Sequence, residues 1–273
     1  MKKWIGSALV YLLIVIGGYT AYSYFVAEDS AYNEVGHGEH ESIEKGEDHS
    51  HGDAHDNESD SEVTADVEIS GETLTVKLID NQGNPMDDLE VNHEKLVHLI
   101  LISEDLEIFR HLHPEKIDPG VFNVDANLEE GMYQAFVDIK PSELPYMIKP
   151  HPLMVGDHGT HGDAHAHLHP DTEWTKEQNG YSVTLEVDNF SVKDNVVLSF
   201  NIEGAEPEPY LGALGHVVVV NETLEEFIHV HPRAGEAPVF EAHFSKPGMY
   251  KLWAEFKLNG EVYAFPYVLE ITE

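Results

Sequence analysis

Two stretches of the chain decide how its fold is interpreted: residues 98–114, HLILISEDLEIFRHLHP, and residues 216–232, HVVVVNETLEEFIHVHP. A shift of 118 residues aligns them, with three histidines and a proline at identical spacing. The match continues from residues 121–122 to residues 239–240. After a one-residue gap it extends from residues 131–133 to residues 248–250, both GMY. Such an extended match indicates an internal duplication.

Short strand patterns recur in each copy, and no amphipathic stretch of helical length competes with them. Residues 74–79, 97–102 and 133–139 are rich in β-branched and other apolar side chains and are separated by Gly, Asn, Pro and Asp. The two GMY segments are typical of the tyrosine corner of Greek-key sandwiches. The sequence therefore predicts an all-β protein with two tandem β-sandwich domains of immunoglobulin or cupredoxin type, at residues 63–156 and 173–273.

The remaining segments carry targeting and linker signals. Residues 4–27 are uncharged and mostly apolar, follow two lysines, and are long enough to cross a hydrocarbon core of about 30 Å. We interpret residues 1–27 as a membrane anchor or a signal peptide, so the rest of the chain is expected outside the cytoplasm, anchored by residues 4–27 or otherwise secreted. Residues 28–62 are predicted to be an acidic, histidine-rich flexible tether, and residues 157–172 a histidine-rich linker between the domains.

Composition excludes several classes of function. Asp and Glu number 51 against 15 Lys and Arg, and the net charge of −36 would repel a phosphate backbone, so no nucleic-acid partner is expected. The absence of cysteine removes disulfides, thiolate zinc sites, iron–sulfur clusters and the blue-copper centre. A metal bound by this chain would use nitrogen, oxygen or thioether ligands.

The histidines of the repeat suggest a metal site in each domain. A tight hairpin about residues 104 and 105 would place His98 opposite His111 and Ile100 opposite Phe109, with His113 on the same face. The second copy would pair its residues likewise, Val218 with Phe227 among them. The candidate ligands are His98, His111, His113, His216, His229 and His231.

Three neutral imidazoles suit Cu(II), Zn(II) or Ni(II), and the Irving–Williams order favours copper, so Cu(II) or Zn(II) is the expected ion. The alternative is that each His-x-His-Pro merely ends a strand with solvated rings, but duplication of the spacing favours the metal interpretation. Because the ordinary histidine pKa is about 6.5, affinity is expected to fall steeply between about pH 7 and pH 5. His151 and His243 have no histidine counterpart in the other copy and are treated as peripheral.

Histidines also occur throughout the two acidic stretches, where they are expected to capture metal weakly and exchangeably. The alternative is an ordinary solvated acidic linker, which accounts for the carboxylates but not for the histidines. The predicted weak ligands are His37, His40, His49, His51, His55, His158, His161, His165, His167 and His169.

The sequence resembles a known group of domains. Residues 99–106 (LILISEDL) leading to HLHP at 111–114, and residues 209–216 (PYLGALGH) leading to HVHP at 229–232, are similar to bacterial extracytoplasmic domains that are loosely cupredoxin-like or YtkA-like. Such domains accompany copper and heavy-metal handling systems. The resemblance covers both repeats and implies a non-enzymatic metal-associated surface protein whose motif histidines are candidate ligands. The chain lacks the cysteine ligand of true cupredoxins, which argues against electron transfer.

The expected function is therefore an extracytoplasmic metal-binding protein, not an enzyme, that buffers, sequesters or delivers copper or zinc at the cell surface. Its expected partners are metal ions and an envelope protein such as a metal transporter. One alternative is a surface adhesion or scaffold module whose histidines are incidental. A less favoured alternative is a copper enzyme of superoxide-dismutase type, because that enzyme also places His-x-His on a sandwich strand.

Overall fold

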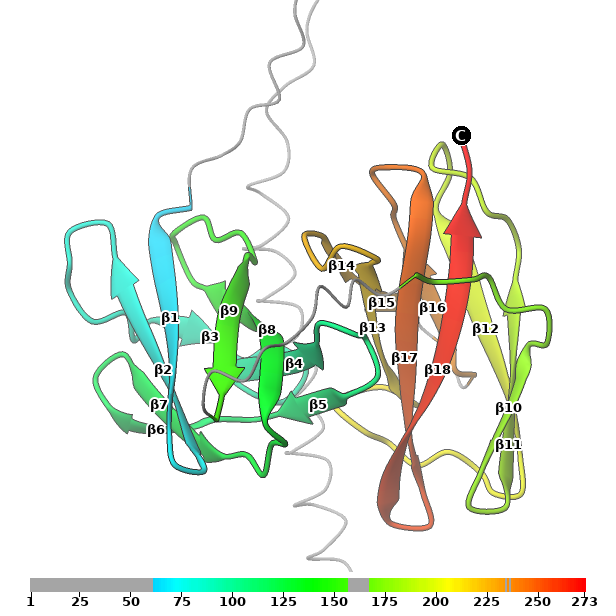
Figure 1. Ribbon diagram of the computed structural model, residues 1–273, viewed down its shortest axis with the longest axis horizontal. Coiled ribbons are helices and arrows are strands. Elements are labelled where there is room, and N and C mark those ends of the chain that lie inside the picture. Colours follow the sequence, from blue (N-terminus) through cyan, green and yellow to red (C-terminus); the bar gives the residue numbers. More distant parts are fainter. Residues whose placement is uncertain (1–60, 157–166, 234, 236) are drawn as a thin grey trace, which may run out of the picture. The chain divides into compact units, whose positions relative to one another are not determined.

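Every regular element in the described part of the protein is a β-strand (Figure 1). The structure is a computed structural model that describes residues 61–156, 167–233, 235 and 237–273. The predicted anchor at residues 1–27, nearly all of the tether and linker residues 157–166 lie outside the described residues. Among the described residues there is no helix long and apolar enough to cross a membrane.

The first repeat forms a β-sandwich of two antiparallel sheets. One sheet has the order β1 (Val63–Ser70), β2 (Thr73–Asp80), β7 (Val121–Asp125), β6 (Glu115–Asp118). The other has the order β3 (Leu89–Glu90), β8 (Gly131–Pro141), β4 (Val97–Ser103), β5 (Phe109–Leu112), and β9 (Pro150–Val155) also pairs with β8.

The second repeat forms an equivalent sandwich. Its first sheet has the order β10 (Thr175–Gln178), β11 (Tyr181–Val187), β12 (Val196–Glu203), β16 (Val239–Ala242), β15 (His231–Pro232). Its second sheet has the order β14 (Phe227–His229), β13 (His216–Asn221), β17 (Gly248–Leu258), β18 (Glu261–Ile271). The predicted all-β class with two tandem sandwiches is confirmed.

Alternation of apolar and polar residues builds each core. Along β2, Leu74, Val76 and Leu78 are buried while the residues between them are not. The predicted tyrosine corners are present as well: the hydroxyl of Tyr133 donates to the carbonyl of Glu129, and that of Tyr250 donates to the carbonyl of Lys246. These bonds fix the start of β8 and of β17, the long strands in the centre of each second sheet.

The predicted pairing of the histidine hairpins is wrong by two residues. His111 lies opposite Ile100 rather than His98, and in the second copy His229 lies opposite Val218 rather than His216. The reason is the loop, which has four residues, 104–107, instead of two; its ends are joined by a bond from the Ser103 amide to the Ile108 carbonyl. A shift of two residues preserves the side-chain alternation, so the histidines still share one face.

The same unusual backbone conformation occurs in both hairpin loops. Leu106 has φ 63° and Leu224 has φ 57°, in the left-handed region that is unfavourable for a side chain as large as leucine. Both leucines are nevertheless buried. They are held there because they pack in an apolar cluster that joins the two sandwiches.

Candidate functional site between the two sandwiches

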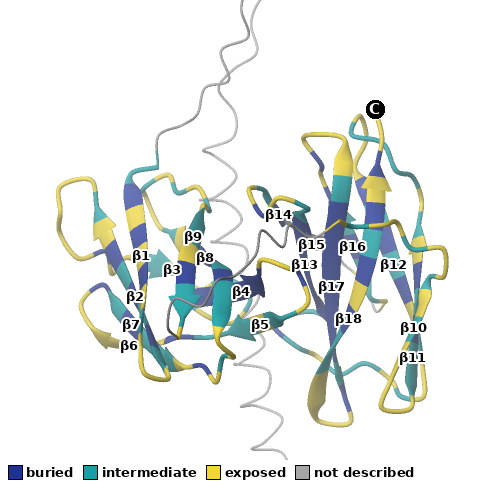
Figure 2. Ribbon diagram, in the orientation of Figure 1, coloured by how far each residue is buried: buried dark blue, intermediate teal, exposed yellow. Residues whose placement is uncertain are grey.

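Strand β4 is buried along its whole length (Figure 2). Each of its faces contacts a different part of the protein. Val97, Leu99 and Leu101 point into the core of the first sandwich. Ile100 and Ile102, on the opposite face, pack with residues of the second sandwich, among them Val218 and Val220 of β13. The histidine-bearing face is therefore an interface between the repeats.

Aromatic contacts show that the two repeats meet through equivalent surfaces. Phe109 stacks on Trp253 with ring centroids 4.9 Å apart, and Phe136 packs against Phe227 at 5.4 Å. In the repeat alignment Phe109 corresponds to Phe227 and Phe136 to Trp253. Each contact is thus the image of the other under exchange of the copies, as in an isologous dimer interface.

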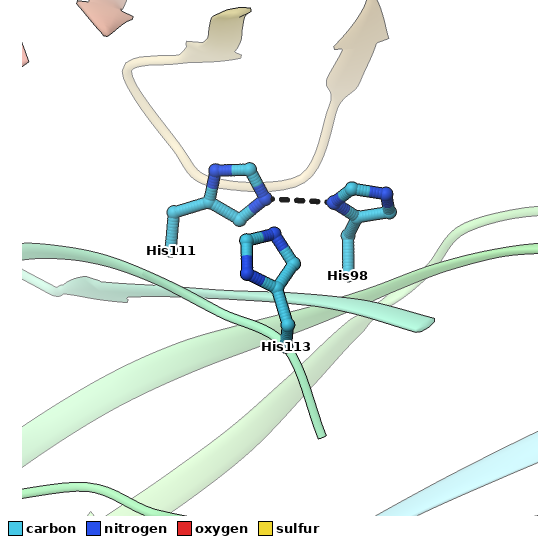
Figure 3. Close-up of side chains that lie close together, drawn as sticks. All are labelled: His98, His111 and His113. Atoms are coloured by element: carbon cyan, nitrogen blue, oxygen red, sulfur yellow. Dashed lines mark hydrogen bonds between the residues drawn. The ribbon is translucent and has the colours of Figure 1, made fainter. Parts of the chain in front are cut away.

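Four imidazoles and a carboxylate converge at one end of this interface. Figure 3 shows His98, His111 and His113 of the first copy with their rings turned toward one another. His216 of the second copy lies 4.6 Å from His111 and 5.8 Å from His98, centroid to centroid. Two overlapping sets of potential ligand atoms lie within 4.8 Å: His98, His111 and His113, and then His111, His216 and Glu255.

The described cluster joins the two domains, whereas the spacing predicted a site in each domain. His111 extends from β5 of the first sandwich to Glu255 on β17 of the second, so the cluster takes side chains from both copies. The apolar face that leads to the histidines packs on the other repeat. This packing brings His216 beside the first copy's histidines, so one composite cluster forms.

Strand pairing positions His216 next to Glu255. The two residues are direct partners on β13 and β17, as are His98 and Asp138 on β4 and β8. Gly215, with φ 144°, allows this approach, since a Cβ there would lie 2.8 Å from the Glu255 carbonyl oxygen.

One ring nitrogen of His98 is occupied by the backbone. Its Nε2 lies 2.9 Å from the carbonyl oxygen of Asn92, and because a carbonyl oxygen can only accept, Nε2 carries the hydrogen. In the neutral ring, Nδ1 then has no hydrogen and carries a lone pair. That lone pair lies 2.9 Å from Nε2 of His111.

His111 has the complementary arrangement. Its Nδ1 lies 2.5 Å from Oε2 of Glu255, and an ionised carboxylate can only accept, so Nδ1 carries a hydrogen. In a neutral His111 ring, Nε2, which faces His98, also carries a lone pair. Two lone pairs cannot bond to one another, so the gap between His98 and His111 requires a cation, either a proton on His111 or a metal ion.

Two further ring nitrogens have unused acceptor or donor capacity. Nε2 of His113 and Nδ1 of His216 are buried and have no hydrogen-bond partner among the described residues. Nδ1 of His216 is 3.7 Å from Oε2 of Glu255, which is beyond hydrogen-bonding distance. A buried polar atom without a partner costs about 1–3 kcal/mol, so these atoms require an explanation.

Burial keeps His98, His113 and His216 neutral. It lowers the pKa of His98 to about 3 and the pKa values of His113 and His216 to about 4, with the neighbouring histidines lowering them further. For Glu255 burial acts to raise the pKa, but His111 and His216 outweigh it and lower the value to about 2. At neutral pH His98, His113 and His216 therefore offer neutral rings beside one ionised carboxylate, the protonation states in which such groups bind metals.

One member of the cluster, Glu255, and a histidine beside the cluster, His93, were not singled out in the sequence. Glu255 was missed although a carboxylate faces the first histidine in both copies, Asp138 in one and Glu255 in the other. His93 was missed because it has no counterpart in the second repeat; its ring lies 6.0 Å from that of His98 and 5.4 Å from that of His216. The paired carboxylates were a signal that the repeat alignment contained.

The other predicted ligands are exposed, have side chains that are not described, or lie outside the described part. His229 ends β14 and His231 begins β15, which belongs to the opposite sheet; their side chains are not among those described. His167 and His169 are exposed, and His243 is exposed beside Asn195. The weak ligands outside the described residues are His37, His40, His49, His51, His55, His158, His161 and His165.

Fold and site together define a tandem β-sandwich protein with a histidine and glutamate cluster between its two copies. The chain belongs to the family described as Domain of unknown function (DUF8832), which matches residues 54–151 and 174–273. The two matches correspond to the two repeats. No curated protein matches the sequence.

Among solved structures, the chain is similar to adhesins and a pilin, among other proteins. One is the Escherichia coli adhesin FdeC, with 18% sequence identity, coverage of 78% of this chain and 65% of that chain, and a TM-score of 0.23. Another is the Yersinia pseudotuberculosis adhesin InvE, with 11% identity, coverage of 73% of this chain and 54% of that chain, and a TM-score of 0.21. A third is BcpA, the major pilin subunit of Bacillus cereus, with 11% identity, coverage of 65% of each chain and a TM-score of 0.20. Less than two thirds of each of these chains is covered, and at these TM-scores the likeness carries no functional argument.

Proposed function

We propose that the protein binds a divalent transition-metal ion, Cu(II) or Zn(II), in the composite cluster between its two sandwiches. The observation that carries this proposal is the pair of facing nitrogens, Nδ1 of His98 and Nε2 of His111, 2.9 Å apart. The outer nitrogen of each ring is bonded to an oxygen acceptor, so both inner lone pairs point at the same position.

The spacing of these nitrogens suits a single ion. Imidazole nitrogens bind such ions at about 2.0–2.1 Å, so two of them on one ion lie about 2.9 Å apart at a right angle and about 3.3 Å apart at the tetrahedral angle. His113 and His216 add ring nitrogens that lack other partners among the described residues. Nitrogen donors of this kind favour Cu(II) and Zn(II) over calcium.

The groups behind the ligands also support a metal. Ligating histidines usually donate their other N–H to a carboxylate or a backbone carbonyl, which orients the ring. Here Asn92 provides the carbonyl for His98, and Glu255 provides the carboxylate for His111. The negative charge of buried Glu255 would also be balanced by the ion, which reduces the cost of burying it.

The role that best fits this site is extracytoplasmic metal buffering, sequestration or delivery, with an envelope partner such as a metal transporter. Neutral, largely buried ligands favour retention of the ion, whereas exposed histidines such as His167 and His169 would exchange it rapidly. The resemblance to domains that accompany copper-handling systems supports the same role. No catalytic step is needed for it.

The test is a competition titration of the metal-free full chain with Zn(II) and Cu(II) against a chelator that removes weakly bound ions. We expect one chelator-resistant equivalent per chain. His113→Ala should weaken it by more than about 100-fold, because a ligand is lost, and it breaks no hydrogen bond among those described. The matched control His243→Ala, at an exposed ring, should retain it.

The competing proposal is a surface adhesion or scaffold module, which the tandem sandwiches would serve equally well. In that case a proton between the facing nitrogens of His98 and His111 would satisfy that pair, and the cluster would hold no metal. A wild-type chain without a chelator-resistant equivalent, or a His113→Ala variant that retains it, would favour this second proposal. A loaded protein that dismutes superoxide would instead support the enzyme alternative.

A further inference from the structure

We propose that His93 is the exchange ligand of the composite site: it takes the metal ion from solvent and passes it to the buried imidazoles. This inference rests on the proposed function and adds to it the route by which the ion enters and leaves. His93 would set the rates of uptake and release, while the inner ligands would set the equilibrium affinity.

His93 is presented by a strained hairpin. The amide of Asn92 donates to the carbonyl of Lys95 at 2.8 Å, and the amide of Lys95 donates back at 3.0 Å. The two residues between them have positive φ angles, 46° for His93 and 66° for Glu94. Such a turn usually contains Asn and Gly, so histidine and glutamate occupy it at an energetic cost.

This hairpin is joined directly to the cluster. The carbonyl of Asn92 accepts the Nε2 hydrogen of His98, and the neighbouring ring of His93 lies edge-on to both His98 and His216. His93 therefore contacts one histidine from each copy.

Exposure distinguishes His93 from the rings behind it. His93 is half-buried, whereas His98 is fully buried and His216 is 9% exposed. The imidazoles thus form a graded series from the surface to the interior. An ion that moved along it would lose its water ligands in steps.

The second copy shows that the hairpin does not need a histidine. Tyr210 and Ala213 form the same two-residue turn, with Leu211 at φ 53° and Gly212 at φ 80° between them. Leu211 occupies the position of His93 and is buried. The imidazole in the first copy is therefore not required by the turn, and its position beside the cluster is consistent with a role in binding.

The experiment compares the wild-type full chain with His93→Leu, which introduces the residue that the second copy carries at this position. Zn(II) uptake is measured by stopped-flow, and release is measured after mixing the loaded protein with excess chelator. We expect both rates to fall by about tenfold or more, with equilibrium affinity changed by less than about threefold. His93→Asn, which tolerates positive φ, should behave in the same way, and His243→Leu should match the wild type.

The possible outcomes separate the two proposals. Unchanged rates in a folded His93→Leu variant would overturn the exchange role alone. A loss of affinity caused only by faster release would also overturn it, because His93 would then be an ordinary ligand. If the wild-type chain bound no metal, the proposed function would fail and the exchange role would fail with it.

Discussion

His98 and His216 occupy the same position in the two repeats, and their rings face each other across the interface, with centroids 5.8 Å apart and planes 5° from parallel. Equivalent residues meet in this way only where two copies are related by an approximate two-fold axis. The cluster lies where the two copies meet. Neither sandwich contains the whole cluster by itself.

His216→Ala is therefore expected to weaken metal binding although His98, His111 and His113 all lie in the other sandwich. The affinity of the chelator-resistant equivalent should fall by at least about tenfold, as measured by competition titration. The variant breaks no hydrogen bond of Nδ1, which has no partner among the described residues. Full retention of the affinity would show that the second repeat contributes nothing to the site.

The metal-free fold is expected to lose stability as the pH falls below about 6.5. Burial lowers the pKa of His98 to about 3 and that of His216 to about 4, whereas the unfolded chain protonates both near pH 6.5. Below pH 6.5 the unfolded state therefore binds more protons, so the free energy of unfolding falls with the pH. Between pH 6.5 and 5 the pair contributes a loss of at most about 4 kcal/mol, measurable by urea unfolding.

For the pH effect, His169→Ala is the matched control, because the ring at this position is exposed and its removal should leave the pH slope unchanged. His216→Ala should reduce the slope. A metal-free protein with equal stability at pH 7 and pH 5 would contradict the burial of these rings.

Metal retention at pH 5 is expected to differ between buried and exposed ligands. The steep loss that the ordinary histidine pKa predicts should apply to exposed histidines only. Because the folded pKa values of His98, His113 and His216 are about 3 to 4, protons compete with the metal at these rings only at lower pH. Dialysis at pH 7 and pH 5 followed by metal analysis should find the same single tight equivalent, and its absence at pH 5 would show that protons enter the cluster.

Trp253→Ala should destabilise the protein and weaken the metal site together. Trp253 is buried against Phe109 of the other sandwich, and removal of a buried aromatic ring costs about 3–5 kcal/mol. Urea unfolding measures the first effect and competition titration the second. Ile117→Ala, at a residue 54% exposed, should change the free energy of unfolding by less than about 0.5 kcal/mol.

Leu106→Gly tests whether burial holds the strained hairpin loop. Glycine would relieve about 1–2 kcal/mol of left-handed strain, but the lost buried side chain costs about 2–5 kcal/mol, so a net loss of stability is expected. Glu94→Gly is the matched control, because it relieves the same kind of strain at an exposed side chain. It should stabilise the metal-free protein by about 0.5–1 kcal/mol, and a stabilised Leu106→Gly would contradict the role of burial.

The amino-acid sequence by itself determined the duplication, the all-β class and the side-chain alternation that puts His98, His111 and His113 on one face. These features depend on local spacing and on the comparison of one repeat with the other. Even the wrong hairpin register left the shared face intact, since the error was two residues.

Only the tertiary structure decided what that face packs against. The alternation in β4 marks both faces as buried, but a hydrophobic pattern does not specify its partner surface, because the hydrophobic effect is not directional. The contact between His111 and Glu255 joins residues 144 positions apart and exists only because the repeats dock through Phe109, Phe136 and Trp253. Among the described side chains, that docking forms a cluster shared by both repeats, which the spacing along the chain did not predict.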